Sequence, residues 1–111
     1  MRMIKAWVKM IQAKEIIPVL ATVVPITQER EQKKIGTQKS INEFNNCLRE
    51  YANENNLEVL DLQKSLDDGT EGRYLRNTYA NPDGLHLRES TYLHVLDPFM
   101  ISLTRKIFHK H

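Results

Sequence analysis

The chain has 111 residues, of which 41% are hydrophobic and 27% are charged, the composition of one globular domain rather than two. Its net charge of +2 is too small to argue for nucleic-acid binding, and no basic run is interleaved with aromatic residues. We therefore expect no nucleic-acid partner. The single cysteine, Cys47, excludes an internal disulfide and fits a reducing compartment.

The first residues predict an amphipathic helix over residues 3–14. Apolar side chains recur there at intervals of three and four residues, the period of one helix face: Ile4, Trp7, Val8 and Ile11. We therefore expect Trp7 to pack in the core rather than to bind a ligand.

A basic start followed by an apolar run over residues 16–26 faintly resembles a secretory signal. Pro18 and Pro25 interrupt that run, and no small-residue cleavage site follows it cleanly, so we expect no signal peptide. The run has eleven residues, too few to span a bilayer, so we also expect no membrane span. The localisation stays open, with the cytoplasm as the default expectation.

Residues 16–24 predict a strand buried on both faces, because the run is continuous, apolar and rich in β-branched residues. Residues 26–39 are polar and predict a loop. The sequence "SINE" then forms a capping-box pattern in which Ser40 and Glu43 would satisfy each other's amides. A helix over residues 41–54 follows, with apolar residues on one face: Ile41, Phe44, Leu48 and Tyr51.

The second half of the chain begins with a short apolar run, residues 57–62, which predicts another strand. Residues 63–82 are polar and show no clear periodicity. A helix over residues 90–107 is predicted by a stripe of apolar side chains, which Pro98 should kink unless it lies in the first turns. The stripe consists of Tyr92, Leu96, Phe99, Leu103 and Ile107.

The order helix, strand, helix, strand, loop, helix predicts an α/β fold with a parallel sheet and a right-handed crossover. Doubly wound sheets of the flavodoxin-like type usually have about five strands, whereas only two are predicted here. The chain is therefore predicted to be a single partial domain over residues 1–111. Its first strand would have an open hydrophobic edge prone to pairing, so we expect a homo-oligomer or a complementing N-terminal segment.

The segment "NPDGLHLRESTY" places Asp83 three residues before His86, with Gly84 between them. An aspartate at that spacing can fold back to the imidazole, where it would fix the tautomer of a general base. The pair also follows a predicted strand, at the edge where α/β sheets bind ligands. The alternative is ordinary turn chemistry, for which "PDG" is a common sequence.

The order of these segments resembles the C-terminal half of SGNH hydrolases, the GDSL-type esterases and lipases. The resemblance rests on "IIPVLATVVPIT", a helix containing Asn45, the strand "LEVLDL" and the block Asp83-Gly84-Leu85-His86. It implies that His86 is the general base and that Asp83 is its orienting acid. It also implies that the N-terminal strands of the domain are missing, that the substrate is a small acyl or acetyl ester, and that no metal or cofactor is needed.

The sequence departs from that family in lacking its nucleophile and oxyanion blocks, G-D-S and G-x-N-D. None of the serines lies in such a motif: Ser40, Ser65, Ser90 and Ser102. A base and an acid without a nucleophile cannot form an acyl-enzyme, so we expect this chain alone to be inactive. A non-catalytic truncated module that oligomerises through its open sheet edge is the alternative.

Four residues of the long 63–82 segment are candidates for substrate contacts: Arg73, Tyr74, Arg76 and Asn77. Asp61 could line the site, but capping of the following turn is the favoured role. Cys47 is expected to be structural rather than nucleophilic, and His94 to be solvated. His109 and His111 could bind a metal weakly, although a frayed tail is the favoured interpretation, and no cluster has zinc-ligand spacing.

Overall fold

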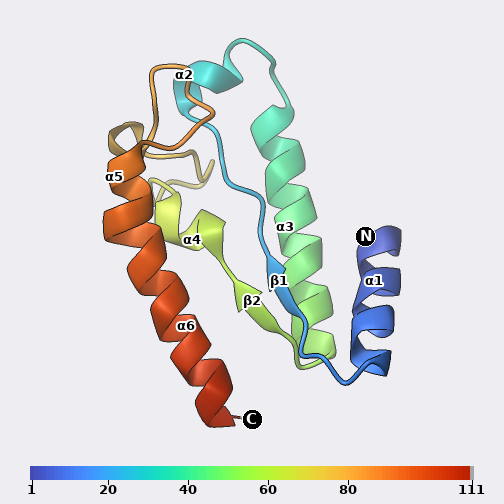
Figure 1. Ribbon diagram of the computed structural model, residues 1–111. Helices are drawn as coiled ribbons and strands as arrows, with labels where there is room; N and C mark the ends of the chain where they lie inside the picture. The colour runs from blue at the N-terminus through green and yellow to red at the C-terminus, as the bar shows by residue number, and fades with distance from the viewer. Residues whose placement is uncertain (111) are drawn as a thin grey trace.

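The computed structural model describes residues 1–110 and has the predicted α/β architecture (Figure 1). Its helices are α1 (Arg2–Ala13), α2 (Gln28–Glu31), α3 (Thr37–Glu54), α4 (Leu62–Leu66), α5 (Glu89–Thr91) and α6 (Asp97–Lys110). Two strands, β1 (Val19–Ala21) and β2 (Glu58–Leu60), pair in parallel with Val19 opposite Glu58. Helices α3 and α6 both contact β2, and Figure 1 shows them on opposite sides of the strands. The predicted parallel pairing across a helical crossover is therefore confirmed.

The first helix, α1, is confirmed, but the prediction that Trp7 packs in the core is wrong. Val8 is only 2% exposed, whereas Trp7 is 54% exposed. The two side chains differ because α1 touches the rest of the chain along a narrow stripe only. Trp7 lines an open cleft of about 230 Å³ between α1 and β1 instead of entering the core.

The first strand is shorter than predicted and is not buried on both faces. β1 spans three residues, and the Val19 side chain is 43% exposed. Ile17 before the strand and Val23 after it are exposed to a similar extent. Exposure alternates along the strand, with Ile17, Val19, Ala21 and Val23 exposed and Pro18 and Thr22 buried, so one face of β1 is left uncovered by the described residues.

Helix α3 begins before the predicted capping box. Its N-terminal cap is Gly36, which has a left-handed φ of 101°, and Ser40 lies inside the first turns of the helix. The carboxylate of Glu31 accepts hydrogen bonds from the amides of Gly36 (3.0 Å) and Gln38 (2.8 Å). These backbone bonds lower the pKa of Glu31. A charged cap from the preceding helix therefore replaces the predicted serine cap.

The last helical region runs from Glu89 to Lys110 without interruption, close to the prediction. It comprises α5, a π-helical turn η2 (Tyr92–Leu96) and α6. Pro98 is the second residue of α6 and follows closely after the π-helical turn. Its missing amide therefore falls where the regular pattern of helical backbone hydrogen bonds is already altered. Leu96 is buried, but Tyr92, predicted on the same stripe, is exposed.

A cluster of buried apolar side chains lies outside the sheet, between α4, the segment that follows it and η2. The segment predicted as irregular contains α4 and a short 3₁₀ turn, η1 (Asn77–Tyr79), and it delivers apolar side chains to this cluster. The buried members are Leu66, Leu75, Ala80, Leu87 and Leu96. Within residues 1–110, no helix has the length and apolar character needed to cross a bilayer.

Candidate active site

Asp83 and His86 lie at the tip of a compact loop formed by residues 79–88. The amide of Arg88 donates to the carbonyl of Tyr79 (2.9 Å), and the amide of Asn81 donates to the carbonyl of His86 (2.8 Å). Between these bonds, Ala80 and Leu87 form an antiparallel bridge, and both side chains enter the buried cluster. The loop is therefore a small hairpin whose base is held by the core and whose tip faces solvent.

The predicted contact between the aspartate and the histidine is present. Asp83 Oδ2 pairs with His86 Nδ1, and Asp83 Oδ1 accepts from the amides of Leu85 (2.9 Å) and His86 (3.0 Å). The bond from the His86 side chain and these two amide bonds hold the pKa of Asp83 well below its usual range. The His86 side chain is 76% exposed, so its Nε2 edge is accessible from solvent. The pair has the geometry of a base and its orienting carboxylate, and its catalytic role remains a prediction.

Gly84 attaches this tip to the start of α2. Its carbonyl accepts from the amide of Thr27 (3.1 Å), and its φ of 72° lies in the left-handed region. A Cβ at this position would lie 2.4 Å from Thr27 Oγ1 and 2.8 Å from Arg30 Cβ. Only glycine allows this approach, so Thr27 and Gly84 fix where the Asp83–His86 turn lies. Thr27 also caps α2 by accepting from the amide of Arg30 (3.2 Å).

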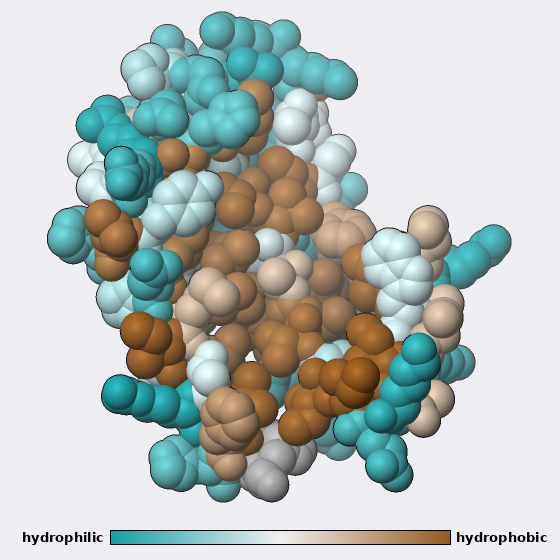
Figure 2. Space-filling model, in the orientation of Figure 1, coloured by the Kyte–Doolittle hydropathy of each residue, from teal (hydrophilic) through white to brown (hydrophobic). Residues whose placement is uncertain are grey.

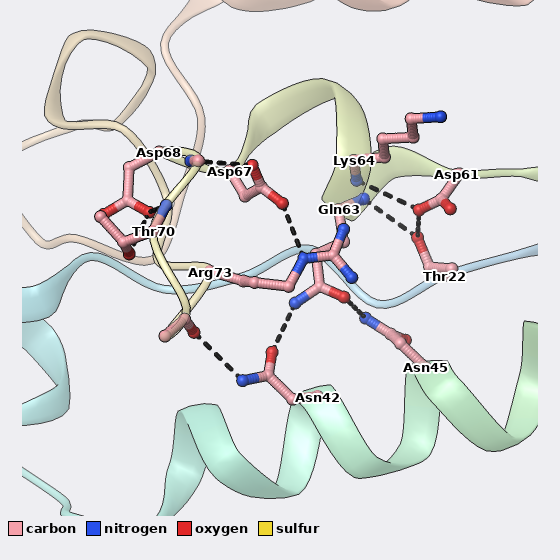
Figure 3. A network of polar contacts seen from close by, with 12 residues as sticks. Thr22, Asn42, Asn45, Asp61, Gln63, Lys64, Asp67, Asp68, Thr70 and Arg73 are labelled. Carbon is pink, nitrogen blue, oxygen red and sulfur yellow. Dashed lines mark hydrogen bonds and ion pairs between the residues drawn. The ribbon is translucent and has the colours of Figure 1, made fainter.

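A buried set of side-chain amides joins α3 to the ends of both strands (Figure 3). Asn45 binds both backbone groups of Val23, accepting from its amide (2.7 Å) and donating to its carbonyl (2.9 Å). Asn45 also donates to Gln63 Oε1 (3.0 Å), and Gln63 donates to Asn42 Oδ1 (2.6 Å). Asn45, which the family resemblance singled out, therefore holds the segment after β1 against α3.

Asp61 caps the helix after β2, as favoured from the sequence. Its carboxylate accepts from the amide of Lys64 (3.1 Å) and from Thr22 Oγ1 (3.2 Å), and it forms a salt bridge with Arg49 (2.8 Å). Burial opposes the charge of Asp61, but the hydrogen bonds from Arg49 and Lys64 outweigh it and lower its pKa. Asp61 is thus committed to holding β1, α3 and α4 together.

The four candidates for substrate contacts have different surroundings. Arg73 forms a salt bridge with Asp67 (2.8 Å), and Arg76 donates to the Asp67 carbonyl (2.8 Å), so both help to shape the loop. The Tyr74 ring lies against the backbone of Gly72. Asn77 has a different position, because it is exposed and lines a cavity of about 150 Å³ beside the Asp83–His86 turn. The walls of this cavity include Thr27, Asn77, Asn81, Gly84 and Arg88. Contact with a substrate remains a prediction for all four.

The remaining reactive residues lie apart from the pair. Within residues 1–110, no hydrogen bond joins His86 to a serine hydroxyl, and Ser65 donates to the carbonyl of Asp61 (3.3 Å). Cys47 and His94 are exposed, so Cys47 is not part of the core. The part of the chain that the structure describes contains no group of three His, Cys, Asp or Glu side chains able to hold a metal. His111, one member of the weak metal candidate, lies outside the described residues.

Three positioning residues were not identified from the sequence: Thr27, Glu31 and Gln63. A threonine directly before a helix is a recognisable capping signal, so Thr27 could have been found. Glu31 binds amides at the start of the next helix, and Gln63 binds Asn45, which is distant in the chain. No local sequence pattern indicates either contact.

The fold defines a class: part of an α/β domain with a parallel sheet, in which the Asp83–His86 pair lies in the loop before the last helical region. Comparison with solved structures gives the same class. The chain superimposes on a GDSL-like lipase from Bacteroides thetaiotaomicron with a TM-score of 0.72 and 20% identity. It superimposes on a protein from Bacteroides fragilis assigned as an acylhydrolase with a TM-score of 0.69 and 26% identity.

Both matches cover 96% of this chain but only 49% of the solved chain, so the protein spans about half the length of its structural neighbours. The chain has the fold of the C-terminal half of an SGNH hydrolase, and the resemblance indicated by the sequence is confirmed. No family model and no curated protein matches the sequence.

Proposed function

We propose that the chain supplies the base-and-acid part of a serine-type ester hydrolase. The observation that carries the proposal is the contact between Asp83 Oδ2 and His86 Nδ1 at the tip of a loop held by the core. The orienting bond occupies Nδ1 and leaves Nε2 to take a proton from a nucleophile. The likeness to a GDSL-like lipase and an acylhydrolase supports this reaction class.

The roles follow from the chemistry of acyl transfer. His86 Nε2 would accept the hydroxyl proton of a serine as it attacks an ester carbonyl, and would then protonate the leaving alcohol. Asp83 would hold the imidazole in the required tautomer and stabilise its charged form. The substrate would be a small acyl or acetyl ester, and the reaction as proposed uses no cofactor. Asn77 would contact the substrate from the cavity beside the turn.

In this proposal residues 1–111 are a single partial domain, and the complete sheet has the flavodoxin-like doubly wound order. Neither a G-D-S nor a G-x-N-D block occurs in the sequence. The serine and the oxyanion donors would therefore come from another polypeptide segment, and this chain alone would be inactive. Loss of a single oxyanion donor costs about 3–4 kcal/mol of transition-state stabilisation, so the tetrahedral intermediate would be poorly supported.

A chimera tests the proposal. The part of the Bacteroides fragilis protein that the match leaves uncovered, which the proposal takes as its N-terminal half, is fused ahead of residue 1, and hydrolysis of p-nitrophenyl acetate is measured. We expect turnover by the chimera and a loss of roughly a thousandfold or more in His86→Ala and Asp83→Asn. His94→Ala is the matched control and should retain most activity, because His94 is exposed and lies apart from the Asp83–His86 pair.

Two results would contradict the proposal. A cooperatively folded chimera whose activity survives His86→Ala would remove the assigned base. Turnover by the isolated 111-residue chain that His86→Ala abolishes would show that a nucleophile is already present, contrary to the predicted inactivity.

A second candidate is a non-catalytic module that self-associates. The observation that favours it is the exposed apolar surface along β1, which includes Ile17, Val19 and Val23. Sedimentation equilibrium distinguishes the two candidates. A stable homodimer without activity in the chimera would favour the module, whereas a monomer would count against it.

A further inference from the structure

We propose that the outer edge of β1 is a docking site for one β-strand of a polypeptide from outside these 111 residues. The occupant carries the half of the fold that this chain lacks, and its strand runs parallel to β1. The inference rests on the fold of the chain and does not depend on ester hydrolysis.

The backbone of β1 presents hydrogen-bonding groups to this edge. The amide of Thr22 donates to the carbonyl of Leu60 (3.1 Å), so Thr22 is directed toward β2. In a parallel ladder, alternate residues direct their amide and carbonyl groups to the same neighbour. Leu20 therefore also faces β2, and Val19 and Ala21 direct their backbone groups outward. A strand added there would find a template of defined spacing.

Asn45 sets the end of the template. After Val19 and Ala21, Val23 is the next residue whose backbone groups are expected to point away from β2. The Asn45 side chain binds both its amide (2.7 Å) and its carbonyl (2.9 Å). The side-chain amide thus takes the place that a neighbouring strand would occupy. Strand addition can use Val19 and Ala21 but must stop before Val23, which limits the docked strand to a short segment in a single register.

The surroundings of the edge are apolar and open. Figure 2 shows hydrophobic surface gathered over the strands between α6 and α1, with hydrophilic residues around α2. A cleft of about 300 Å³ at the amino end of β1 is lined by Trp7, Met10, Ile11, Lys14 and Ile16. A groove of about 550 Å³ beyond its carboxyl end includes Val23, Lys34, Ile35, Ile41 and Phe44. Both hollows could receive side chains of the occupant on either side of its docked strand.

Geometry disfavours a second copy of this chain as the occupant. Two copies related by a twofold axis would pair their β1 strands antiparallel, in a fold whose strands are parallel. That arrangement would also bring Lys14, at the amino end of one strand, toward Lys34, at the carboxyl end of the other. Helix α1 carries basic side chains and no acidic ones, which adds to the repulsion between the two copies.

The missing half-domain fits the edge better. The solved structures contain about as much chain again beyond the matched region, since only 49% of each is covered. In α/β domains with helices on both faces, the strands are buried and apolar and run parallel to their neighbours. The occupant is therefore an apolar strand that runs parallel to β1.

Hydrogen exchange tests the proposal in the isolated chain and in the fusion with the part of the Bacteroides fragilis protein that the match leaves uncovered. We expect the amide of Ala21 to exchange roughly a hundredfold more slowly in the fusion. The amides of Leu20 and Thr22 face β2 and should be protected in both, which makes them internal controls. An unprotected Ala21 in the fusion would overturn the proposal. If the Ala21 amide of the isolated chain became protected as the protein concentration rose, the edge would be a site of self-association and the proposal would be wrong.

Ala21→Pro provides a second test, because it removes the outward amide without affecting the bonds to β2. We expect the isolated variant to keep its unfolding midpoint, and the fused variant to unfold in two transitions instead of one. Ala21→Val keeps the amide and should unfold in one transition. A single unchanged transition in the fused Ala21→Pro variant would exclude strand docking. Because these measurements do not involve esterase activity, a failure here is distinct from a failure of the proposed reaction.

Discussion

The amide of Thr27 donates a hydrogen bond to the carbonyl oxygen of Gly84, and this bond attaches the Asp83–His86 turn to the start of α2. Gly84→Ala should therefore be strongly destabilising. The new methyl group would overlap Thr27 Oγ1, and alanine is strained at a φ of 72°. We expect a loss of about 2–4 kcal/mol in the free energy of unfolding, measured by urea denaturation.

Gly69→Ala is the matched control for this substitution. Gly69 has a similar φ of 78°, but a Cβ there would meet no atom within 4 Å. It should show the backbone strain alone, about 1–2 kcal/mol. An equal loss of unfolding free energy in the two variants would show that the close contact with Thr27 adds nothing to the backbone strain.

Asn45→Ala should destabilise the chain by about 2–4 kcal/mol, because it leaves the amide and carbonyl of Val23 without partners. The neighbouring Asn46→Ala removes an exposed contact with Arg49 and should change stability by less than about 0.5 kcal/mol. Chemical denaturation of both variants measures the difference. If the two substitutions had the same effect, Asn45 would not hold the segment after β1.

The cap of α3 gives a further prediction. Glu31→Gln should lower the thermal midpoint, because the amides of Gly36 and Gln38 lose a charged acceptor. Ser40→Ala should leave the midpoint nearly unchanged, since Ser40 lies inside the helix. If Ser40→Ala lowered the thermal midpoint more than Glu31→Gln, the cap of α3 would instead be the Ser40 capping box predicted from the sequence.

Asp83 predicts a pH dependence whose sign follows from its lowered pKa. Its pKa in the folded chain lies below the ordinary value of 3.8, so its contribution to stability is fully present above that value. The contribution is lost as the pH falls through the pKa of the folded state. The difference in stability between the wild type and Asp83→Asn should therefore shrink on acidification below about pH 4.

Carbon-13 NMR of the Asp83 carboxyl checks the same prediction directly. In His86→Ala the largest cause of the shift is absent, so the Asp83 pKa should rise toward its ordinary value. An Asp83 carboxyl that titrates near its ordinary value in the wild type would show that the pair is not formed in solution.

Local patterns predicted the elements whose signals are confined to a few turns of chain. The spacing of Leu48 with its neighbours located α3, and the aspartate three residues before His86 predicted the contact between them. The errors arose where distant residues decide the outcome. Glu31 replaced Ser40 as the cap because the preceding helix places a carboxylate beside the first amides of α3.

The first strand shows the same limit. Its apolar run predicted burial on both faces, but burial depends on which elements cover each face, and Val19 lies on a face of β1 that the described residues leave exposed. The contact of Gly84 with Thr27 was likewise beyond reach, because nothing in either local sequence identifies the other. Periodicity predicts which face of an element is apolar, but not which partner covers it.

The position of the buried cluster has a consequence for assembly. Ala80 and Leu87, at the base of the 79–88 loop, pack in this cluster with Leu75, and the loop is held by contacts made within this chain. The Asp83–His86 pair is therefore preorganised before any partner arrives. Ordering one flexible side chain on association costs about 0.5–1.5 kcal/mol, and this pair avoids most of that cost. A polypeptide that packs against this loop would meet a turn whose shape is already set.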